Sequence, residues 1–169
     1  MRLPLAYLLL IASAGLGNDV WYDLPNSVVQ TSKGPLVVDR TPDGSGYNVR
    51  LAGKNVEGLD ADGASASLSD LIRVGSHELV VIAVYSGGTA CPAQYAVLEI
   101  SPSPRLSEFF GTCNPAARLT PGKGSLTISM PGYFANPEVL SDSERREIAA
   151  RVDTFVWSSG KVHQVNHAP

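Results

Sequence analysis

Two cysteines, Cys91 and Cys113, constrain the fold of this chain more than any other feature. Each lies in a short loop bounded by glycine and proline, GTACP at residues 88–92 and GTCNP at residues 111–115, and each loop adjoins a strand-like run. A disulfide between residues 22 apart would stabilise the fold by about 3 kcal/mol, because it restricts the unfolded chain. We therefore expect a structural cross-link between two strand ends.

The sequence leaves two other roles open for these cysteines. Cys91 could be a nucleophile with His77, His163 or His167 as its base, but that chemistry needs a free, activated thiol. A labile redox pair is the third role, although redox cysteines usually stand in a CxxC motif. The structural disulfide is favoured because two cysteines of an exported protein are usually oxidised.

The first 17 residues, MRLPLAYLLLIASAGLG, have the pattern of a secretory signal peptide. Arg2 gives a positive start, residues 3–11 are apolar, and Ala12-Ser13-Ala14 matches a small-residue cleavage site. The apolar stretch is shorter than the roughly 20 residues that span a bilayer. We expect cleavage after Ala14 or Gly17, and hence a periplasmic or secreted protein with no transmembrane segment after cleavage.

The remaining residues, 18–169, have the length of one disulfide-linked globular domain. Loss of Arg2 lowers the 13 basic side chains to 12 against 16 acidic ones, so the net charge changes from −3 to −4. A mildly acidic chain without basic clusters is a poor candidate for binding nucleic acid. Its 16 glycines and 12 prolines indicate short elements joined by tight turns.

The hydrophobic pattern predicts a mainly β to α+β fold, an antiparallel sheet or sandwich of about eight short strands with one C-terminal helix. Residues 79–85 (LVVIAVY) are apolar on both faces, which indicates a central strand that is covered on both sides. We expect it to pair with residues 94–101 as a hairpin across the first cysteine loop. The other candidate strands are residues 36–38, 47–51, 56–59, 126–130, 154–157 and 161–165.

Three segments receive other assignments. Residues 18–33 are expected to be irregular, residues 60–67 to be a loop, and residues 68–74 are ambiguous between helix and strand. A capping box, Ser141 followed by Glu144 three residues later, predicts a helix over residues 142–151. Within that helix Glu147 is placed to pair with Arg151.

No motif in the sequence supports catalysis, a metal or a cofactor. Ser158-Ser-Gly-Lys161 has a serine–lysine spacing found in penicillin-interacting enzymes, but the two companion motifs are missing and a hairpin turn explains it. Asp60-Ala-Asp62 begins like a calcium loop and lacks the later ligands. We therefore expect no catalytic residues, no metal ligands and no cofactor.

The segment SGGTACPA at residues 86–93, together with FGTC at residues 110–113 and MPG at residues 130–132, resembles a group of small exported proteins of Gram-negative bacteria. The resemblance covers residues 79–132, about a third of the chain. It implies a periplasmic, disulfide-linked domain and carries no activity with it.

We expect the protein to be an exported periplasmic binding or inhibitory module, such as an enzyme inhibitor or a toxin-immunity protein, with another envelope protein as its partner. An envelope hydrolase with dispersed active-site residues and a small-ligand carrier are the alternatives. The expected contact loops contain Gly87, Gly88, Thr89, Gly111 and Thr112, with both threonines on the surface. The C-terminal hairpin around Trp157 is the second choice for the contact surface.

Overall fold

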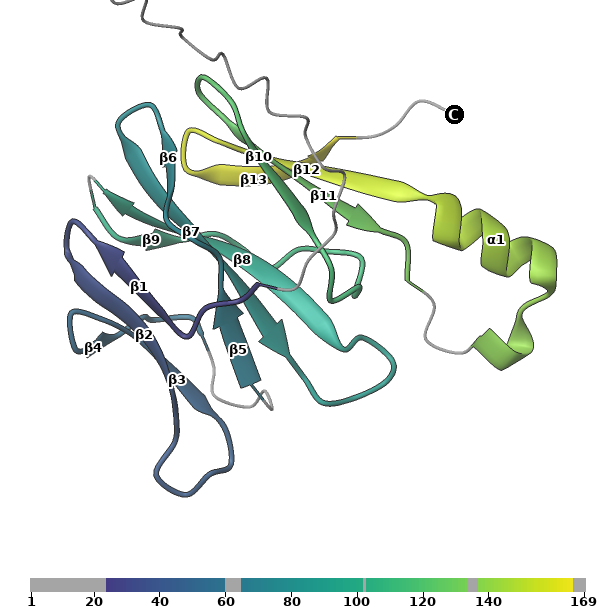
Figure 1. Ribbon diagram of the computed structural model, residues 1–169, viewed down its shortest axis with the longest axis horizontal. Helices are drawn as coiled ribbons and strands as arrows, with labels where there is room; N and C mark the ends of the chain where they lie inside the picture. The colour runs from purple at the N-terminus through teal and green to yellow at the C-terminus, as the bar shows by residue number, and fades with distance from the viewer. Residues whose placement is uncertain (1–23, 60–64, 102, 134–136, 166–169) are drawn as a thin grey trace, which may run out of the picture.

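The computed structural model describes residues 24–59, 65–101, 103–133 and 137–165 (Figure 1). The expected signal peptide lies outside the described residues, as do Asp60, Asp62 and His167. Across the described residues the fold is mainly β, with antiparallel sheets and one α-helix. This confirms the predicted class. The strand number was underestimated, because the described residues form thirteen strands in three sheets.

The central strand is β7 (His77–Tyr85), which pairs antiparallel with β8 (Ala93–Ser101). The hairpin predicted across the first cysteine loop is therefore confirmed. Strands β5 (Ser65–Leu68) and β6 (Ile72–Val74) pair with the other edge of β7, and β9 (Arg105–Leu106) pairs with β8. These five strands form the middle layer of the molecule (Figure 1).

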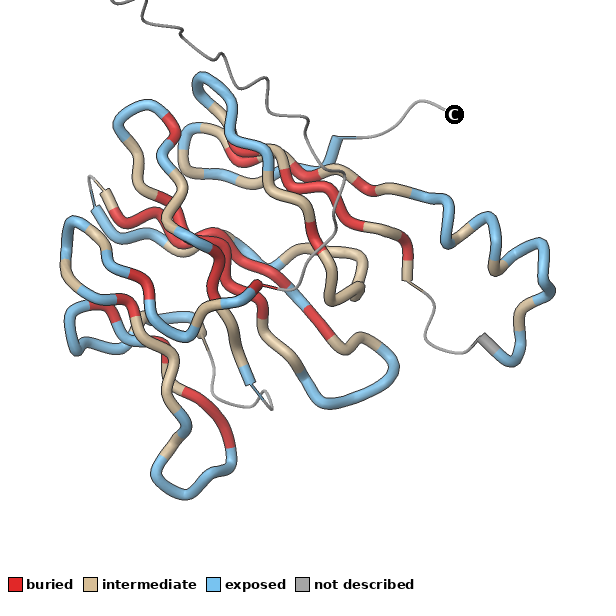
Figure 2. The backbone as a smooth tube through the Cα atoms, viewed as in Figure 1, coloured by how far each residue is buried: buried red, intermediate tan, exposed pale blue. Residues whose placement is uncertain are grey.

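The apolar run of β7 is buried because both of its faces are covered. Leu79, Val81 and Ala83 belong to one hydrophobic cluster, whereas Val80 and Ile82 belong to a second. Successive side chains of a strand point to opposite faces of the sheet, so the two clusters lie on opposite sides of β7. Figure 2 shows the buried residues concentrated along this middle layer. The prediction of a doubly covered central strand is confirmed.

A four-stranded meander covers one face of the middle layer. It consists of β1 (Val28–Thr31), β2 (Gly34–Arg40), β3 (Tyr47–Leu51) and β4 (Lys54–Asn55), in sequence order. Its inward side chains include Leu36, Tyr47 and Val49, which join the cluster that contains Val80 and Ile82.

A second four-stranded sheet covers the opposite face. It is formed by β10 (Arg118–Pro121), β11 (Leu126–Pro131), β12 (Val152–Ser158) and β13 (Lys161–Val165). Its buried side chains pack against the side of β7 that carries Val81, and they include Leu126, Ile128, Met130, Phe155 and Trp157. The alternation predicted for residues 126–130 correctly places Leu126, Ile128 and Met130 in the core.

Helix α1 (Asp142–Ala150) follows the 3₁₀ turn Pro137–Val139 and projects from the end of the sheet (Figure 1). Both halves of the predicted capping box are present, since the Ser141 hydroxyl accepts from the Glu144 amide and the Glu144 carboxylate accepts from the Ser141 amide. The helix ends one residue earlier than predicted. Arg151 caps it in extended conformation and pairs with Asp153 rather than Glu147.

The strands that the sequence did not indicate are short edge or turn elements. Strand β1 lies within the expected irregular lead-in, β4 lies at the turn before residues 56–59, and β5 extends into the expected loop. Residues 56–59 are not a strand. The ambiguous segment, residues 68–74, contains the last residue of β5 and the whole of β6. Two to four residues carry too little alternation to reveal a strand, and their extended conformation depends on the neighbour they pair with.

Candidate functional site

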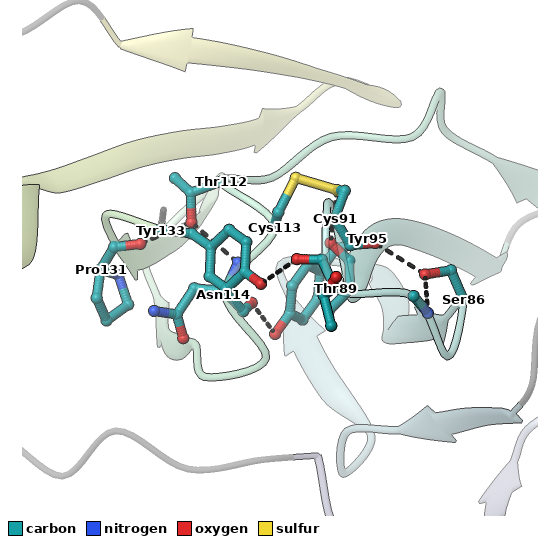
Figure 3. Close-up of a disulfide and its surroundings, with 11 residues drawn as sticks. Ser86, Thr89, Cys91, Tyr95, Thr112, Cys113, Asn114, Pro131 and Tyr133 are labelled. Carbon is teal, nitrogen blue, oxygen red and sulfur yellow. Dashed lines mark hydrogen bonds between the residues drawn. A yellow bond between two sulfur atoms is a disulfide. The ribbon is translucent and has the colours of Figure 1, made fainter. Parts of the chain in front are cut away.

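Cys91 and Cys113 form a disulfide, with their Cα atoms 4.7 Å apart. It joins the loop between β7 and β8 to the segment that precedes β10 (Figure 3). The predicted cross-link is therefore present, and Cys91 has no free thiol to act as a nucleophile.

Hydrogen bonds hold the β7–β8 loop on both flanks of the disulfide (Figure 3). The Ser86 hydroxyl donates to the carbonyl of Cys91 at 2.9 Å and accepts from the amide of Gly88 at 3.1 Å. On the other flank the Tyr133 hydroxyl donates to the carbonyl of Thr89 at 2.5 Å. The loop is thus fixed by the disulfide to the Cys113 segment, by the hydrogen bond from Tyr133 and by hydrogen bonds within the loop itself.

The tip of this loop is open to solvent. Residues 86–90 are all exposed, so the expected contact residues Gly87, Gly88 and Thr89 lie on the surface (Figure 2). Gly87 has a φ of +73°, a left-handed conformation that favours glycine. Tyr133 binds the backbone carbonyl of Thr89, and the Thr89 side chain has no hydrogen bond to the described residues.

The second pair of expected contact residues has a different setting. Gly111 and Thr112 are half-buried, and the Thr112 hydroxyl donates to the carbonyl of Pro131 at 2.6 Å. A Cβ atom at Gly111 would lie 3.1 Å from the ring of Tyr95. The expectation that Thr112 is a surface side chain was wrong, since this segment anchors the end of β11.

Trp157 lies in the C-terminal hairpin that was the second choice for the contact surface, and it is not available at the surface. Its side chain is in the core and its residue is 1% exposed. Trp157 belongs to the alternating set Asp153, Phe155 and Trp157, all buried on one face of β12. Trp157 therefore cannot contribute to a contact surface on this hairpin, because the strand turns its side chain inward.

A polar cleft lies next to the cross-linked segment. It encloses about 530 Å³ and is lined by Phe110, Gly111, Thr112, Gly132, Tyr133, Ile148, Arg151, Asp153, Phe155 and Gln164. The Arg151 guanidinium binds Asp153 Oδ1 through Nε at 3.1 Å and through Nη2 at 2.9 Å. Gln164 Nε2 donates to the same oxygen at 3.3 Å.

Sequence reasoning missed the polar residues of this cleft. Asp153 is only 9% exposed, and it lies two residues before buried Phe155 in the same strand. Strict alternation along residues 153–157 would have placed an aspartate on the core face, which is unusual enough to mark a site. Gln164 carried no such signal, because its position depends on the pairing of β13 with β12.

A histidine–carboxylate pair lies elsewhere in the middle layer. His77 Nδ1 is 2.7 Å from Glu99 Oε1, and the Glu99 side chain is 7% exposed. The His77 ring also contacts the edge of Trp157, with ring centroids 5.3 Å apart. Sequence reasoning named His77 as a possible base for Cys91, but the structure pairs it with Glu99 instead.

The carboxyls whose pKa values shift clearly lie outside both features. Hydrogen bonds from Thr41 and Ser45 lower the pKa of Asp43 from 3.8 to about 2. Hydrogen bonds from Ser32 lower the pKa of Glu78, and those from Ser141 lower the pKa of Glu144. All three shifts favour the charged carboxylate and belong to turns, inter-strand contacts or the helix cap, where they stabilise local structure.

Within the described residues, no three histidine, cysteine, aspartate or glutamate side chains are grouped to hold a metal ion. No helix in that part of the chain is long and apolar enough to cross a membrane. Comparisons with protein-family models, curated proteins and solved structures find no match to this chain.

Proposed function

We propose that this protein is an exported periplasmic binding or inhibitory module that contacts another envelope protein through the β7–β8 loop. The observation that carries the proposal is the combination of full exposure and covalent attachment in this loop. Residues 86–90 are exposed, while the disulfide and the Tyr133–Thr89 hydrogen bond hold their backbone in place.

The advantage of such a loop is entropic. A flexible loop loses conformational freedom when it binds, and this loss weakens the complex. The Cys91–Cys113 bond restricts the loop before any partner arrives. Rigid loops on a sheet scaffold are a common means of recognition, so the geometry favours a binding module over an enzyme that uses the same surface.

Three features support the proposed location. Disulfides form and persist in oxidising compartments such as the periplasm, and the two cysteines of this chain form a disulfide. The N-terminal pattern and the resemblance to small exported Gram-negative proteins point the same way. N-terminal sequencing of protein recovered from the periplasm should begin near Gly15 or Asn18, whereas full-length protein confined to the cytoplasm would contradict export.

The contact surface can be tested once a partner has been identified by pull-down from periplasmic extract. Thr89→Arg places a bulky charge on the exposed loop without touching the backbone carbonyl that binds Tyr133. Thr120→Arg is the matched control, because Thr120 is exposed on strand β10 at the edge of the outer sheet.

We expect Thr89→Arg to weaken the complex at least tenfold, about 1.4 kcal/mol, while the melting temperature stays close to that of the wild type. The control should bind like the wild type. A folded Thr89→Arg variant with unchanged affinity would place the contact surface elsewhere.

An envelope hydrolase is the alternative, and the His77–Glu99 pair favours it. A carboxylate that accepts from Nδ1 leaves Nε2 free to accept a proton, which is the arrangement of a general base. A generic ester such as p-nitrophenyl acetate distinguishes the two proposals. A hydrolase should lose activity in His77→Gln and retain it in Thr89→Arg, whereas a binding module should show no turnover in any variant.

A further inference from the structure

The polar cleft is built from three elements that converge on one side of the outer sheet. Asp153 and Phe155 are two residues apart in β12, and Gln164 of β13 is the register partner of Phe155. These three side chains therefore project from the same face of the sheet. Phe110, Gly111 and Thr112 also line the cleft, and the Phe110 ring packs on the Phe155 ring with centroids 5.0 Å apart. A cavity of about 530 Å³ lies within the usual size range of small-molecule sites.

The charge of this cleft is balanced. Of the residues that line it, Arg151 and Asp153 are the two with charged side chains, and they form an ion pair at 2.9 Å. The Arg151 side chain is largely exposed, and its pairing with Asp153 leaves the cleft without a net charge that would attract a charged ligand. The cleft therefore favours an uncharged ligand.

Several hydrogen-bonding groups of the cleft remain available. Asp153 Oδ1 accepts all three hydrogen bonds from Arg151 and Gln164, so within the described part of the chain Oδ2 accepts none. Arg151 Nη1 and Gln164 Oε1 are likewise without a hydrogen bond to the described residues. One planar donor and two acceptors thus remain on three side chains that line the cleft and are joined by their mutual hydrogen bonds.

The remaining lining adds a smaller apolar part to the cleft. Phe110, Tyr133 and Ile148 contribute aromatic and aliphatic surface beside the polar groups. A sugar ring has hydroxyl groups on its rim, each both donor and acceptor, and C–H groups on its faces. An uncharged ring of this kind can meet Asp153, Arg151 and Gln164 with its hydroxyls and the apolar wall with its face.

We propose that the cleft between the Phe110–Thr112 segment and strands β12 and β13 is a binding site for a neutral saccharide. The site is separate from the exposed loop tip and does not depend on the protein contact proposed above. Asp153 Oδ2 and Gln164 Oε1 accept hydrogen bonds from ligand hydroxyls, and Arg151 Nη1 donates one.

The test is a nuclear magnetic resonance titration of the ¹⁵N-labelled protein. The probes are two uncharged trisaccharides, triacetylchitotriose and maltotriose, with benzamidine as a cationic probe and benzoate as an anionic one. The side-chain amide of Gln164 is a direct reporter, because it lies in the cleft and binds Asp153. We expect saturable shifts of this amide with at least one trisaccharide, at a Kd near or below 1 mM, and no shift with the charged probes.

Variants connect the binding to the cleft. Gln164→Ala removes a side chain that is exposed and outside the core clusters, so the variant should fold. It should bind the saccharide at least fivefold more weakly than the wild type. Backbone amide shifts measure this affinity. Gln30→Ala in β1, an exposed glutamine of the opposite sheet, should bind like the wild type. Thr89→Arg should also retain saccharide binding, which separates this proposal from the loop contact.

Three results would overturn the proposal. The first is the absence of any chemical-shift change with either trisaccharide at concentrations up to about 10 mM, which is tenfold above a Kd of about 1 mM. The second is a saturable shift of the Gln164 amide with benzamidine or benzoate instead of the trisaccharides. The third is an unchanged saccharide affinity in folded Gln164→Ala protein.

Discussion

Thr89 and Thr112 are two threonines beside the same disulfide with opposite roles. The Thr112 hydroxyl donates to the Pro131 carbonyl at 2.6 Å in a half-buried setting, whereas the Thr89 side chain is exposed. Thr112→Val keeps the shape and leaves that carbonyl without its donor, so we expect a loss of about 1–2 kcal/mol in the free energy of unfolding. Thr89→Val should change it by less than about 0.5 kcal/mol. Urea denaturation of both variants measures the difference, and equal effects would contradict the assignment.

Asp43 gives the fold a pH dependence that can be checked at one residue. Its carboxylate accepts hydrogen bonds from the hydroxyls of Thr41 and Ser45 and from the Ser45 amide, which lower its pKa from 3.8 to about 2. A pKa that is lower in the folded state gives stability that is complete above pH 3.8 and is lost as the pH falls toward 2.

We therefore expect Asp43→Asn to melt at a lower temperature than the wild type at neutral pH. The difference between the two melting temperatures should shrink below pH 4 and become small near pH 2, where the wild-type carboxyl is half protonated in the folded protein. Thermal melts across this range measure it. A difference that stays constant from pH 6 to pH 2 would show that the hydrogen bonds to the charged form contribute nothing.

At the scale of elements, β7 is the strand on which both outer sheets depend. Val81 is fully buried on the face toward β11 and β12. Val81→Asp would bury a carboxylate without a partner, a cost of several kcal/mol that is comparable to the whole stability of a small domain. We expect this variant to lack a cooperative thermal transition in circular dichroism.

The matched control is Val165→Asp in β13, where the valine is 40% exposed. It should fold and melt close to the wild type, because its carboxylate remains in water. Soluble, cooperatively folded Val81→Asp protein would mean that β7 is not the core strand.

Helix α1 shows how local signals differ from packing signals. The capping box of Ser141 and Glu144 correctly predicted where the helix begins, since both hydrogen bonds lie within one turn. None of the helical residues is buried, so the local cap rather than core packing sets this start. The C-terminal end was less predictable because Arg151 leaves the helix to pair with Asp153 of the following strand.

In the molecule as a whole, the disulfide connects the middle layer to one of the two outer sheets. It joins the β7–β8 loop of the middle layer to the segment that leads into β10 of the outer sheet. Its loop of 22 residues should stabilise the fold by about 3 kcal/mol by restricting the unfolded chain. We expect the double variant Cys91→Ser, Cys113→Ser to lose about this free energy of unfolding.

The measurement is urea denaturation, with thiol titration of the wild type under denaturing conditions as its control. The titration should find no free thiol before reduction. Two reactive thiols in unreduced protein would contradict the cross-link. An unchanged stability in the double variant would mean that the bond only orders the loop.

Features that depend on neighbouring residues or on a strong repeat could be predicted from the amino-acid order. These are the antiparallel class, the β7–β8 hairpin, the start of α1 and the pairing of the cysteines, because alternation, capping and a single pair of thiols leave few options. The short strands β1, β4, β5, β6, β9 and β10 could not be predicted, because they have too few residues to show a period and extend only where a neighbour pairs with them. The tertiary structure also decided the cleft, since Asp153, Gln164 and the Phe110–Thr112 segment lie on separate elements whose approach is set by sheet pairing and packing.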